Sequence, residues 1–256
     1  METTILTAAQ KQWVDAVWNK LDGKLATVAL RSKNKLPFQT TDPVHNNMAE
    51  SNIHRWTNGF WPGLMWLMYA GTGKDVYRET AETGEGLLDK AFDEPEKLSH
   101  DVGFMWKLAS GPNYLLTGNE KSWQRMRRAA DHLMGRFNPV GEFIVAWNGD
   151  RKGSPLSGVT IIDTMMNLPL LYWASREYTD PRFKYVAMKH AGLKKECGDL
   201  ARKSEELILK EWRLYGHVHE NYSAIDGLGC SLHSSDKFYH WGGLLAYIAL
   251  DNAEAL

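Results

Sequence analysis

The chain has 256 residues, and its 30 lysines and arginines nearly balance its 31 aspartates and glutamates, which leaves a net charge of −1. This balance, without a basic stripe interleaved with aromatic residues, argues against nucleic acid as a partner. The sequence has neither a basic amphipathic helix nor an apolar run long enough to span a bilayer, which argues against a membrane partner.

The cysteines and the N-terminal residues indicate the redox state and the location of the protein. Cys197 and Cys230 are too few for a disulfide framework and lack the spacing of metal ligands, so we expect reduced thiols. The opening METTILTAAQKQWVDAVW has no charged and apolar leader, which favours a cytoplasmic location. Because no linker or charge block divides the chain, we expect one domain over residues 1–256.

Hydrophobic periodicity predicts helices through most of the chain. In the first of them, apolar residues recur every four positions from Trp13 to Leu25, and Thr7 suits its N-cap. The predicted helices span 7–31, 60–71, 76–91, 99–117, 119–136, 161–178, 181–209 (continuous or broken near Gly192) and 239–250. The predicted loops span 32–53, 137–159 and 213–237, and FIVAW at 143–147 is the one candidate strand.

Three stretches repeat one pattern, in which a polar cluster precedes a helix-length run rich in aromatic residues and methionine, and a short polar turn follows. They cover residues 54–75, 99–120 and 160–182. Apolar helices need burial on most sides, whereas the charged helices between them can face water. We therefore predict an all-α protein, an α/α toroid of helical hairpins with polar residues gathered at one end. The chain holds too few helices for six full hairpins, so we expect a shortened or incomplete ring.

Two aspartates lie near the starts of the second and third repeats. Asp163 follows two isoleucines and is soon followed by two methionines, and a carboxyl group in apolar surroundings suits proton donation. Its place at a helix start fits a plain N-cap equally well. Asp101 has the same ambiguity, because Ser99 can cap that helix and leave Asp101 free. If both carboxyl groups face one cavity, they form the minimal pair for glycosidic chemistry, and His100 is either their hydrogen-bonding neighbour or a surface residue.

Aromatic residues and short motifs bear on where a site could lie. Most of the 11 tryptophans are expected in the core, but Trp147 lies in a polar loop where its ring could stack on a sugar. No GxGxxG, P-loop, HExxH, GxSxG or zinc-type cluster occurs, so we expect no cofactor and no metal. His217, His219 and Glu220 could ligate a metal from one extended segment, but no further ligand lies at a known spacing.

With these residues in view, the chain from about 50 to 190 closely resembles glycoside hydrolase family 88, the unsaturated glucuronyl hydrolases. The matching segments are WTNGFWPGLMWLMY, HDVGFMW, FIVAWNG and IIDTMMNLPLLYWAS, followed by DPRF and KHA. The resemblance implies an (α/α)6 barrel. It also implies an enzyme that removes a 4,5-unsaturated uronic acid from the non-reducing end of oligosaccharides left by polysaccharide lyases.

The resemblance also implies a mechanism and roles for particular residues. A carboxylic acid protonates the C4=C5 vinyl ether, water adds at C5, and the resulting hemiketal opens and releases the shortened saccharide. Asp163 would be the proton donor and water activator, and Asp101 would hold the sugar and tune Asp163. His100 and Trp147 would line the subsite of the uronic ring, and Asn58 would face the pocket from the start of an inner helix.

After His190 the sequence departs from that family, because a Gly-Ser-Thr-His-type stretch and a following segment rich in Gln, Trp and Arg are missing. Residues 203–250 instead resemble the end of the family 63-type α/α-toroid glycosidases, in which the glutamate of the HENY segment, here Glu220, is the catalytic base. The two resemblances together imply a family junction near residue 195.

Two alternatives to the hydration reaction therefore stay open. One is an inverting α-glycosidase that uses an aspartate as acid and Glu220 as base. The other is a catalytically impaired saccharide-binding scaffold in which Asp101 and Asp163 serve mainly as helix caps.

Overall fold

The computed structural model describes residues 7–41, 44–149 and 158–196. The chain divides into two compact units, the first made of residues up to 93 together with 108–123, and the second of 94–107 together with residues from 124 onward. Residues 203–250, with Glu220 and the predicted last helix, lie outside the described residues. A single domain over 1–256 and a junction near 195 therefore stay predictions.

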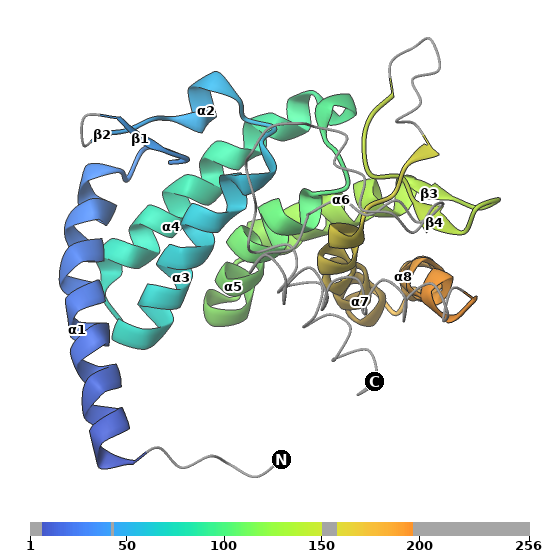
Figure 1. Cartoon of the computed structure of the whole chain (residues 1–256). Helices are drawn as coiled ribbons and strands as arrows, with labels where there is room; N and C mark the ends of the chain where they lie inside the picture. The colour runs from blue at the N-terminus through green and yellow to red at the C-terminus, as the bar shows by residue number, and fades with distance from the viewer. Residues whose placement is uncertain (1–6, 42–43, 150–157, 197–256) are drawn as a thin grey trace, which may run out of the picture. The chain divides into compact units, whose positions relative to one another are not determined.

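The described residues are mostly helical, as the periodicity predicts (Figure 1). The α-helices are α1 (Ala8–Arg31), α2 (Met48–Ser51), α3 (Phe60–Thr72), α4 (Asp75–Leu88), α5 (Leu108–Thr117), α6 (Glu120–Gly135), α7 (Leu168–Glu177) and α8 (Pro181–Glu196). Two short antiparallel hairpins accompany them, formed by β1 (Thr40–Thr41) with β2 (Val44–His45) and by β3 (Phe137–Asn138) with β4 (Phe143–Ile144). No helix in the described ranges is both long and apolar enough to cross a membrane.

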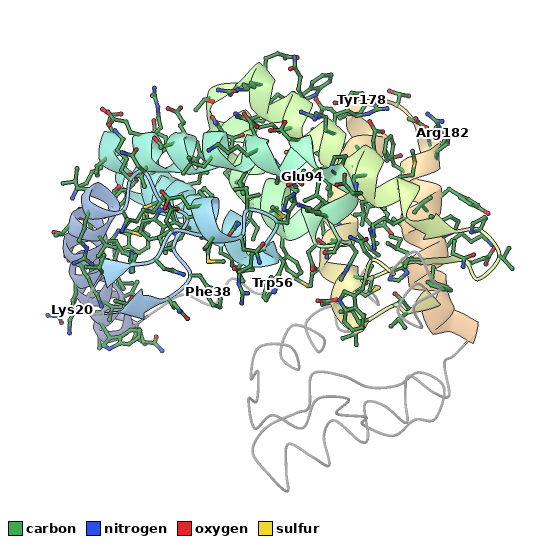
Figure 2. The ribbon with its side chains drawn as sticks, turned by 90° about the horizontal axis from the view of Figure 1, so that it is seen from above. Lys20, Phe38, Trp56, Glu94, Tyr178 and Arg182 are labelled. Atoms are coloured by element: carbon green, nitrogen blue, oxygen red, sulfur yellow. The ribbon has the colours of Figure 1, made fainter. Side chains whose placement is uncertain are left out.

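The first unit is built from α1, α3, α4 and α5, in which α3 contacts both α4 and α5 and α1 contacts α4. The start of α1 is fixed by a capping box, because Gln10 N–H donates to Thr7 Oγ1 and Thr7 N–H donates to Gln10 Oε1. This confirms Thr7 as the N-cap. Much of α1 is exposed, and Lys20 lies on its outer surface (Figure 2).

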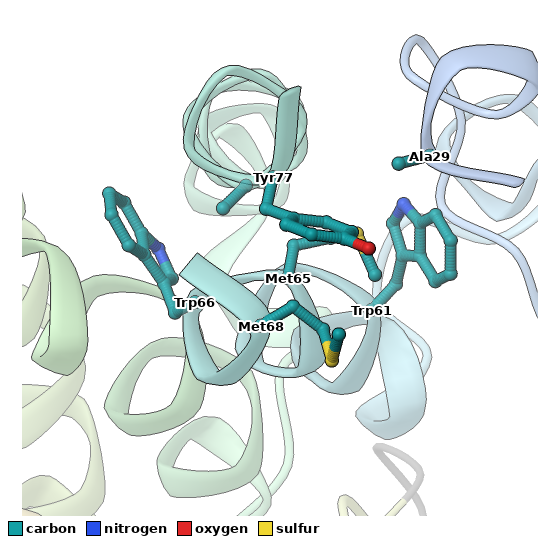
Figure 3. Packing of buried hydrophobic residues seen from close by; sticks show 7 residues of the cluster. Ala29, Trp61, Met65, Trp66, Met68 and Tyr77 are labelled. Carbon is teal, nitrogen blue, oxygen red and sulfur yellow. The ribbon is translucent and has the colours of Figure 1, made fainter. Parts of the chain in front are cut away.

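The core of the first unit lies between α1, α3 and α4 (Figure 3). Its tightly buried members are Ala29, Trp61, Met65, Trp66, Met68, Tyr77 and Ala81. The Tyr77 hydroxyl donates to Asp22 Oδ1 at 2.7 Å and so ties α4 to α1. Truncating a buried aromatic side chain in such a core costs about 3–5 kcal/mol. Packing therefore accounts for the aromatic and methionine-rich character of the first repeat.

Each of the three repeated segments begins with an irregular helical turn that leads into an α-helix. The 3-10 helix η1 (Trp56–Gly59) precedes α3, the π-helix η4 (Gly103–Lys107) precedes α5, and the 3-10 helix η6 (Ile162–Asn167) precedes α7. The α-helices carry prolines near their starts, at Pro62, Pro112 and Pro169. A proline ring crowds the carbonyl group four residues earlier, which for Pro112 is that of Leu108 at the junction with the π-helix. The prolines thus explain why each α-helix begins only after the polar residues at the start of its repeat.

The predicted loop at 32–53 contains more order than the sequence indicates. Asn46 Oδ1 accepts hydrogen bonds from the Phe38 and Gln39 N–H groups at 3.0 and 2.9 Å, which supports the β1–β2 hairpin. Asn47 Oδ1 accepts from Ala49 N–H at 3.2 Å and caps α2. Such side-chain bonds leave no hydrophobic period in the sequence.

Two other segments refine the sequence prediction. Of the candidate strand FIVAW, Phe143–Ile144 forms β4. The predicted helix from 181 passes through Gly192 without a break and is described as far as Glu196. Its remaining predicted residues, up to 209, lie outside the described ranges.

In the second unit, α7 packs against α8, and β4 packs against α8. His190 of α8 joins these elements, because the Ile144 N–H donates to its Nδ1 at 3.1 Å. The imidazole is buried, and burial together with the charge of His100 lowers the pKa of His190 to about 4. His190 is therefore neutral at physiological pH and acts as an acceptor.

We expect acid to destabilise the second unit through His190. The unfolded chain binds this proton near the ordinary pKa of 6.5 and the folded chain only near 4, so the stabilisation is fully present above pH 6.5 and is lost as the pH falls toward 4. The difference corresponds to about 3 kcal/mol. Urea unfolding at several pH values, applied to the wild type and to His190→Asn, measures this pH dependence. The amide oxygen of the asparagine can still accept from the Ile144 N–H. The variant should lose less stability on acidification, and equal losses would contradict the assignment.

Candidate active site

His100 lies at the centre of a polar cluster in the second unit, and its side chain is fully buried. Its backbone N–H donates to the Ala146 carbonyl oxygen at 3.2 Å, and its ring Nδ1 lies 2.6 Å from the same oxygen. A carbonyl oxygen can only accept a hydrogen bond, so Nδ1 must carry a proton. Ala146 thereby fixes Nε2 as the ring atom that exchanges protons with the rest of the cluster.

Two carboxyl groups meet at His100 Nε2. Asp163 Oδ1 lies 3.0 Å from this nitrogen and forms its hydrogen bond, and Asp101 Oδ1 lies 3.2 Å away. Asp101 precedes η4, whereas Asp163 lies in η6, so residues far apart in the sequence converge on one imidazole. Asp163 makes no N-cap bond of η6, whose N-cap position is Ile161. The structure thus brings together three of the predicted site residues.

The two aspartates differ in their access to solvent. The Asp163 side chain is 37% exposed, and the Asp101 side chain is 12% exposed. Asp101 Oδ1 is buried and accepts no well-aligned hydrogen bond within the part of the chain that the structure describes. Of the two carboxyl groups, Asp163 is therefore the one that a bound molecule can reach.

Asp101 is held by its neighbour Ser99. The Ser99 hydroxyl donates to Asp101 Oδ2 at 3.0 Å and accepts from the Asp101 N–H at 3.2 Å, so Ser99 binds Asp101 instead of leaving it free, and capping of the helix by Ser99 stays a prediction. Burial raises the pKa of Asp101, and the charge of Asp163 raises it further. His100, Ser99 and Arg136 oppose this effect, and the resulting pKa lies above the ordinary value of an aspartate.

The pKa of His100 is also raised. Burial disfavours the charged ring and lowers the pKa, but the hydrogen bond to Asp163 and the charges of Asp101 and Asp163 raise it more. Both shifts favour retention of a proton in the cluster. Because the groups interact so closely, that proton belongs to the cluster as a whole rather than to one side chain.

Asn167 joins the two segments that carry the acids, and no motif in the sequence singles it out. Its Oδ1 accepts from the Phe104 N–H at 3.0 Å, and its Nδ2 donates to the Asp163 carbonyl oxygen at 3.4 Å. Gly103 leaves the room for this contact, because a Cβ there would lie 2.4 Å from Asn167 Oδ1. Asn167 thereby holds η6 against η4.

Trp147 directly follows the Ala146 carbonyl that fixes His100. It is half-buried and lines an open pocket of about 490 Å³. The other lining residues are Glu96, Gly135, Arg136, Phe137, Asn138, Val145, Asn148 and Gly149. The described residues that line this pocket thus include Trp147 but not His100, Asp101 or Asp163. A sugar contact at Trp147 stays a prediction.

The described contacts of the cluster do not include Asn58. Asn58 lies in the first unit, where it is buried and its Nδ2 donates to the carbonyl oxygens of Asn52 and Ile53 at 3.1 and 2.9 Å. These bonds hold the turn before α3, and a wall of the pocket at Asn58 stays a prediction. Glu220, the alternative base, lies outside the described residues, as do His217 and His219.

The cluster also has the composition of a cation site. One ligand atom from each of His100, Asp101 and Asp163 can be chosen so that all lie within 4.8 Å of one another. Three protein ligands with an open position are what catalytic zinc sites use, but here His100 Nε2 is already engaged by Asp163. The expectation of no metal and no cofactor stays a prediction.

Comparison with known proteins extends these observations. No family model matches the chain. The chain is 33% identical over 179 residues to the unsaturated glucuronyl hydrolase of Bacillus sp. (strain GL1), covering 68% of this chain and 47% of that protein. It is 32% identical over 157 residues to the unsaturated chondroitin disaccharide hydrolase of Streptococcus pyogenes serotype M1, covering 61% of this chain and 39% of the relative.

Solved structures give the same result. A structure of a UGL variant with dGlcA-Glc-Rha-Glc superposes with a TM-score of 0.62 at 29% identity and covers 72% of this chain and 48% of that chain. The chain thus spans less than half the length of these relatives. The predicted all-α, α/α-toroid fold class is confirmed. Over about two thirds of its length, the chain is therefore related to the unsaturated glucuronyl hydrolases of glycoside hydrolase family 88.

Proposed function

We propose that the protein is a glycoside hydrolase that removes a 4,5-unsaturated uronic acid from the non-reducing end of lyase-generated oligosaccharides. It does so by acid-catalysed hydration of the C4=C5 vinyl ether, without attack on the glycosidic carbon. The substrate class follows from the relatives, which are named for unsaturated glucuronyl and unsaturated chondroitin substrates. Its place is in polysaccharide degradation and carbohydrate metabolism, in the cytoplasm.

One observation carries this proposal, namely the His100 imidazole that holds two carboxyl groups of unequal exposure at Nε2. Vinyl ether hydration needs one acid that reaches the substrate and that can then act as a base toward water. Asp163 is accessible and hydrogen-bonded to a nitrogen that can either donate or accept. Asp101 is buried beside it and adds negative charge next to His100 Nε2, which raises the pKa of the imidazole.

The reaction proceeds in three balanced steps. The Asp163 carboxyl group gives its proton to C4 of the substrate, which leaves positive charge shared between C5 and the ring oxygen. A water molecule adds at C5 while the Asp163 carboxylate takes one of its protons, so the acid is regenerated. The product is a hemiketal at C5, whose ring opens and whose anomeric carbon then releases the shortened saccharide. The net change is the addition of water.

His100 has a defined part in each step. Because its Nδ1 proton is committed to Ala146, Nε2 is an acceptor when Asp163 is protonated and, in the imidazolium, a donor when Asp163 is ionised. The ring can therefore keep Asp163 in one orientation through both stages. Such orientation of the reacting group is worth orders of magnitude in rate.

The absorbance of the C4=C5 double bond tests the proposed function. The full chain is mixed with an unsaturated chondroitin disaccharide, and we expect the ultraviolet band to disappear as reducing sugar is released. Ordinary glycosidic hydrolysis would release sugar and leave the band intact. Binding of the disaccharide without either change would instead support a saccharide-binding scaffold.

A further inference from the structure

Arg136 lies between the end of α6 and the start of β3, and all its described hydrogen bonds go to neutral oxygen atoms. Nε donates to the Val145 carbonyl at 2.8 Å, and Nη2 donates to the Ala146 carbonyl at 3.1 Å. Nη1 donates to the Leu98 carbonyl at 3.1 Å and to Asn148 Oδ1 at 2.7 Å. One guanidinium group therefore binds two separate segments of the second unit.

Two of these acceptors lie next to His100, Leu98 along the chain and the Ala146 oxygen through hydrogen bonds. Leu98 precedes His100 by two residues, and the Ala146 oxygen is the atom that receives both the backbone N–H and the Nδ1 proton of His100. Asn148 strengthens the same junction, because its Nδ2 donates to the carbonyl oxygens of Glu96 and Leu98 at 2.9 and 3.2 Å. Arg136 thus fixes the carbonyl group that fixes His100.

Burying the Arg136 guanidinium group among neutral acceptors costs desolvation free energy, so stability alone does not explain it. Arg136 is partly buried, and no ion pair within the described ranges includes it, although its charge acts on Asp101 from beyond ion-pair distance and lowers the pKa of that carboxyl group. A cation withdrawn from water normally has a carboxylate partner, since neutral carbonyl groups compensate its desolvation less well. The planar fork is matched instead to several fixed acceptors at once, which a lysine ammonium group cannot reproduce.

We infer that Arg136 is a positioning residue for the hydration reaction. It acts through the Ala146 carbonyl oxygen to hold the His100 ring, and through His100 it sets the orientation of Asp163. This role rests on the proposed function for its effect on turnover, but the link between Arg136 and His100 is independent of any substrate.

The link is tested by proton and nitrogen NMR of the imidazole groups in the full chain. The His100 Nδ1 proton, assigned by its absence in His100→Gln, should give a downfield resonance protected from exchange. In Arg136→Ala we expect this resonance to shift upfield or to be lost through exchange with water. Arg182→Ala is the matched control, because the Arg182 side chain is exposed and hydrogen-bonds to Asp180 alone among the described residues (Figure 2). It should leave the resonance in place.

Turnover of the unsaturated disaccharide is the second measurement. A displacement of about 1 Å in a reacting group costs about 100-fold in rate, so kcat of Arg136→Ala should fall by about 100-fold while KM changes much less. Guanidinium ion at millimolar concentration should restore part of the lost kcat by entering the open pocket that Arg136 lines, and sodium chloride should not. Arg182→Ala should keep the kcat of the wild type.

If Arg136→Ala does not fold, Arg136→Lys takes its place in both measurements and should show the same changes to a smaller extent. An unchanged His100 resonance together with an unchanged kcat in a folded Arg136 variant would overturn the inference. A loss of kcat that guanidinium cannot restore, with the resonance unchanged, would overturn it too. If the wild type leaves the disaccharide intact, the proposed function fails, whereas the NMR comparison still decides whether Arg136 positions His100.

Discussion

Replacing Asp163 by asparagine should abolish most of the hydration activity, with kcat on an unsaturated disaccharide falling by about 10²- to 10⁴-fold. The amide keeps the shape of the carboxyl group and can still contact His100, but it can neither give a proton to C4 nor take one from water. Because the side chain keeps its volume, KM should change far less than kcat. Steady-state loss of the ultraviolet band measures both constants.

Asp131→Asn is the matched control for this substitution. Asp131 lies on α6 in the same unit, is 47% exposed and pairs with Arg127 at 2.9 Å. Its loss should leave kcat within about twofold, since an exposed ion pair contributes only about 0–1 kcal/mol. An Asp163→Asn protein with the kcat of the wild type would remove Asp163 from the mechanism.

Replacing Gly103 by alanine should destabilise the second unit by about 3 kcal/mol. A Cβ at this position would lie 2.4 Å from Asn167 Oδ1 and 2.8 Å from Asn167 Cα. The Cα belongs to the backbone of η6, so the clash cannot be relieved by rotating a side chain. The Phe104 hydrogen bond to Asn167 should break as the segments move apart, and the Asp163 carboxyl group should lose its place at His100.

Urea unfolding of Gly103→Ala and Gly192→Ala measures this effect with a control of opposite sign. A Cβ at Gly192, in α8 of the same unit, would meet nothing within 4 Å. Alanine in a helix is favoured over glycine by about 0.5–1 kcal/mol, so that variant should be slightly more stable than the wild type. Equal stability of the two variants would show that η4 and η6 can accommodate a methyl group at Gly103, which contradicts the close contact with Asn167.

Much of the helical framework can be predicted from local patterns. Thr7 and Gln10 form the capping box at the start of α1, and the apolar runs of the three repeats become α3, α5 and α7. These features depend on residues within a few positions of one another, which is why periodicity and capping rules find them. The β1–β2 hairpin depends on Asn46 bonds across seven and eight residues and is missed for that reason.

The residues of the candidate site also differ in whether the sequence can identify them. His100, Asp101 and Asp163 could be named from their residue types and from resemblance, but their meeting could not, because 62 residues separate the two aspartates. Arg136 and Asn167 escape sequence reasoning altogether. Their partners are mainly backbone groups, including Leu98 and Phe104, and a backbone acceptor or donor has no signature in the sequence.

The most direct test of vinyl ether hydration follows the proton itself. The reaction of an unsaturated chondroitin disaccharide is run in D₂O, quenched early and examined by NMR. Protonation of C4 by the Asp163 carboxyl group predicts a saturated uronate product that carries deuterium on one face of C4, at a rate that falls with Asp163→Asn. Release of reducing sugar with a uronate that keeps its C4=C5 bond and its C4 proton would contradict this mechanism.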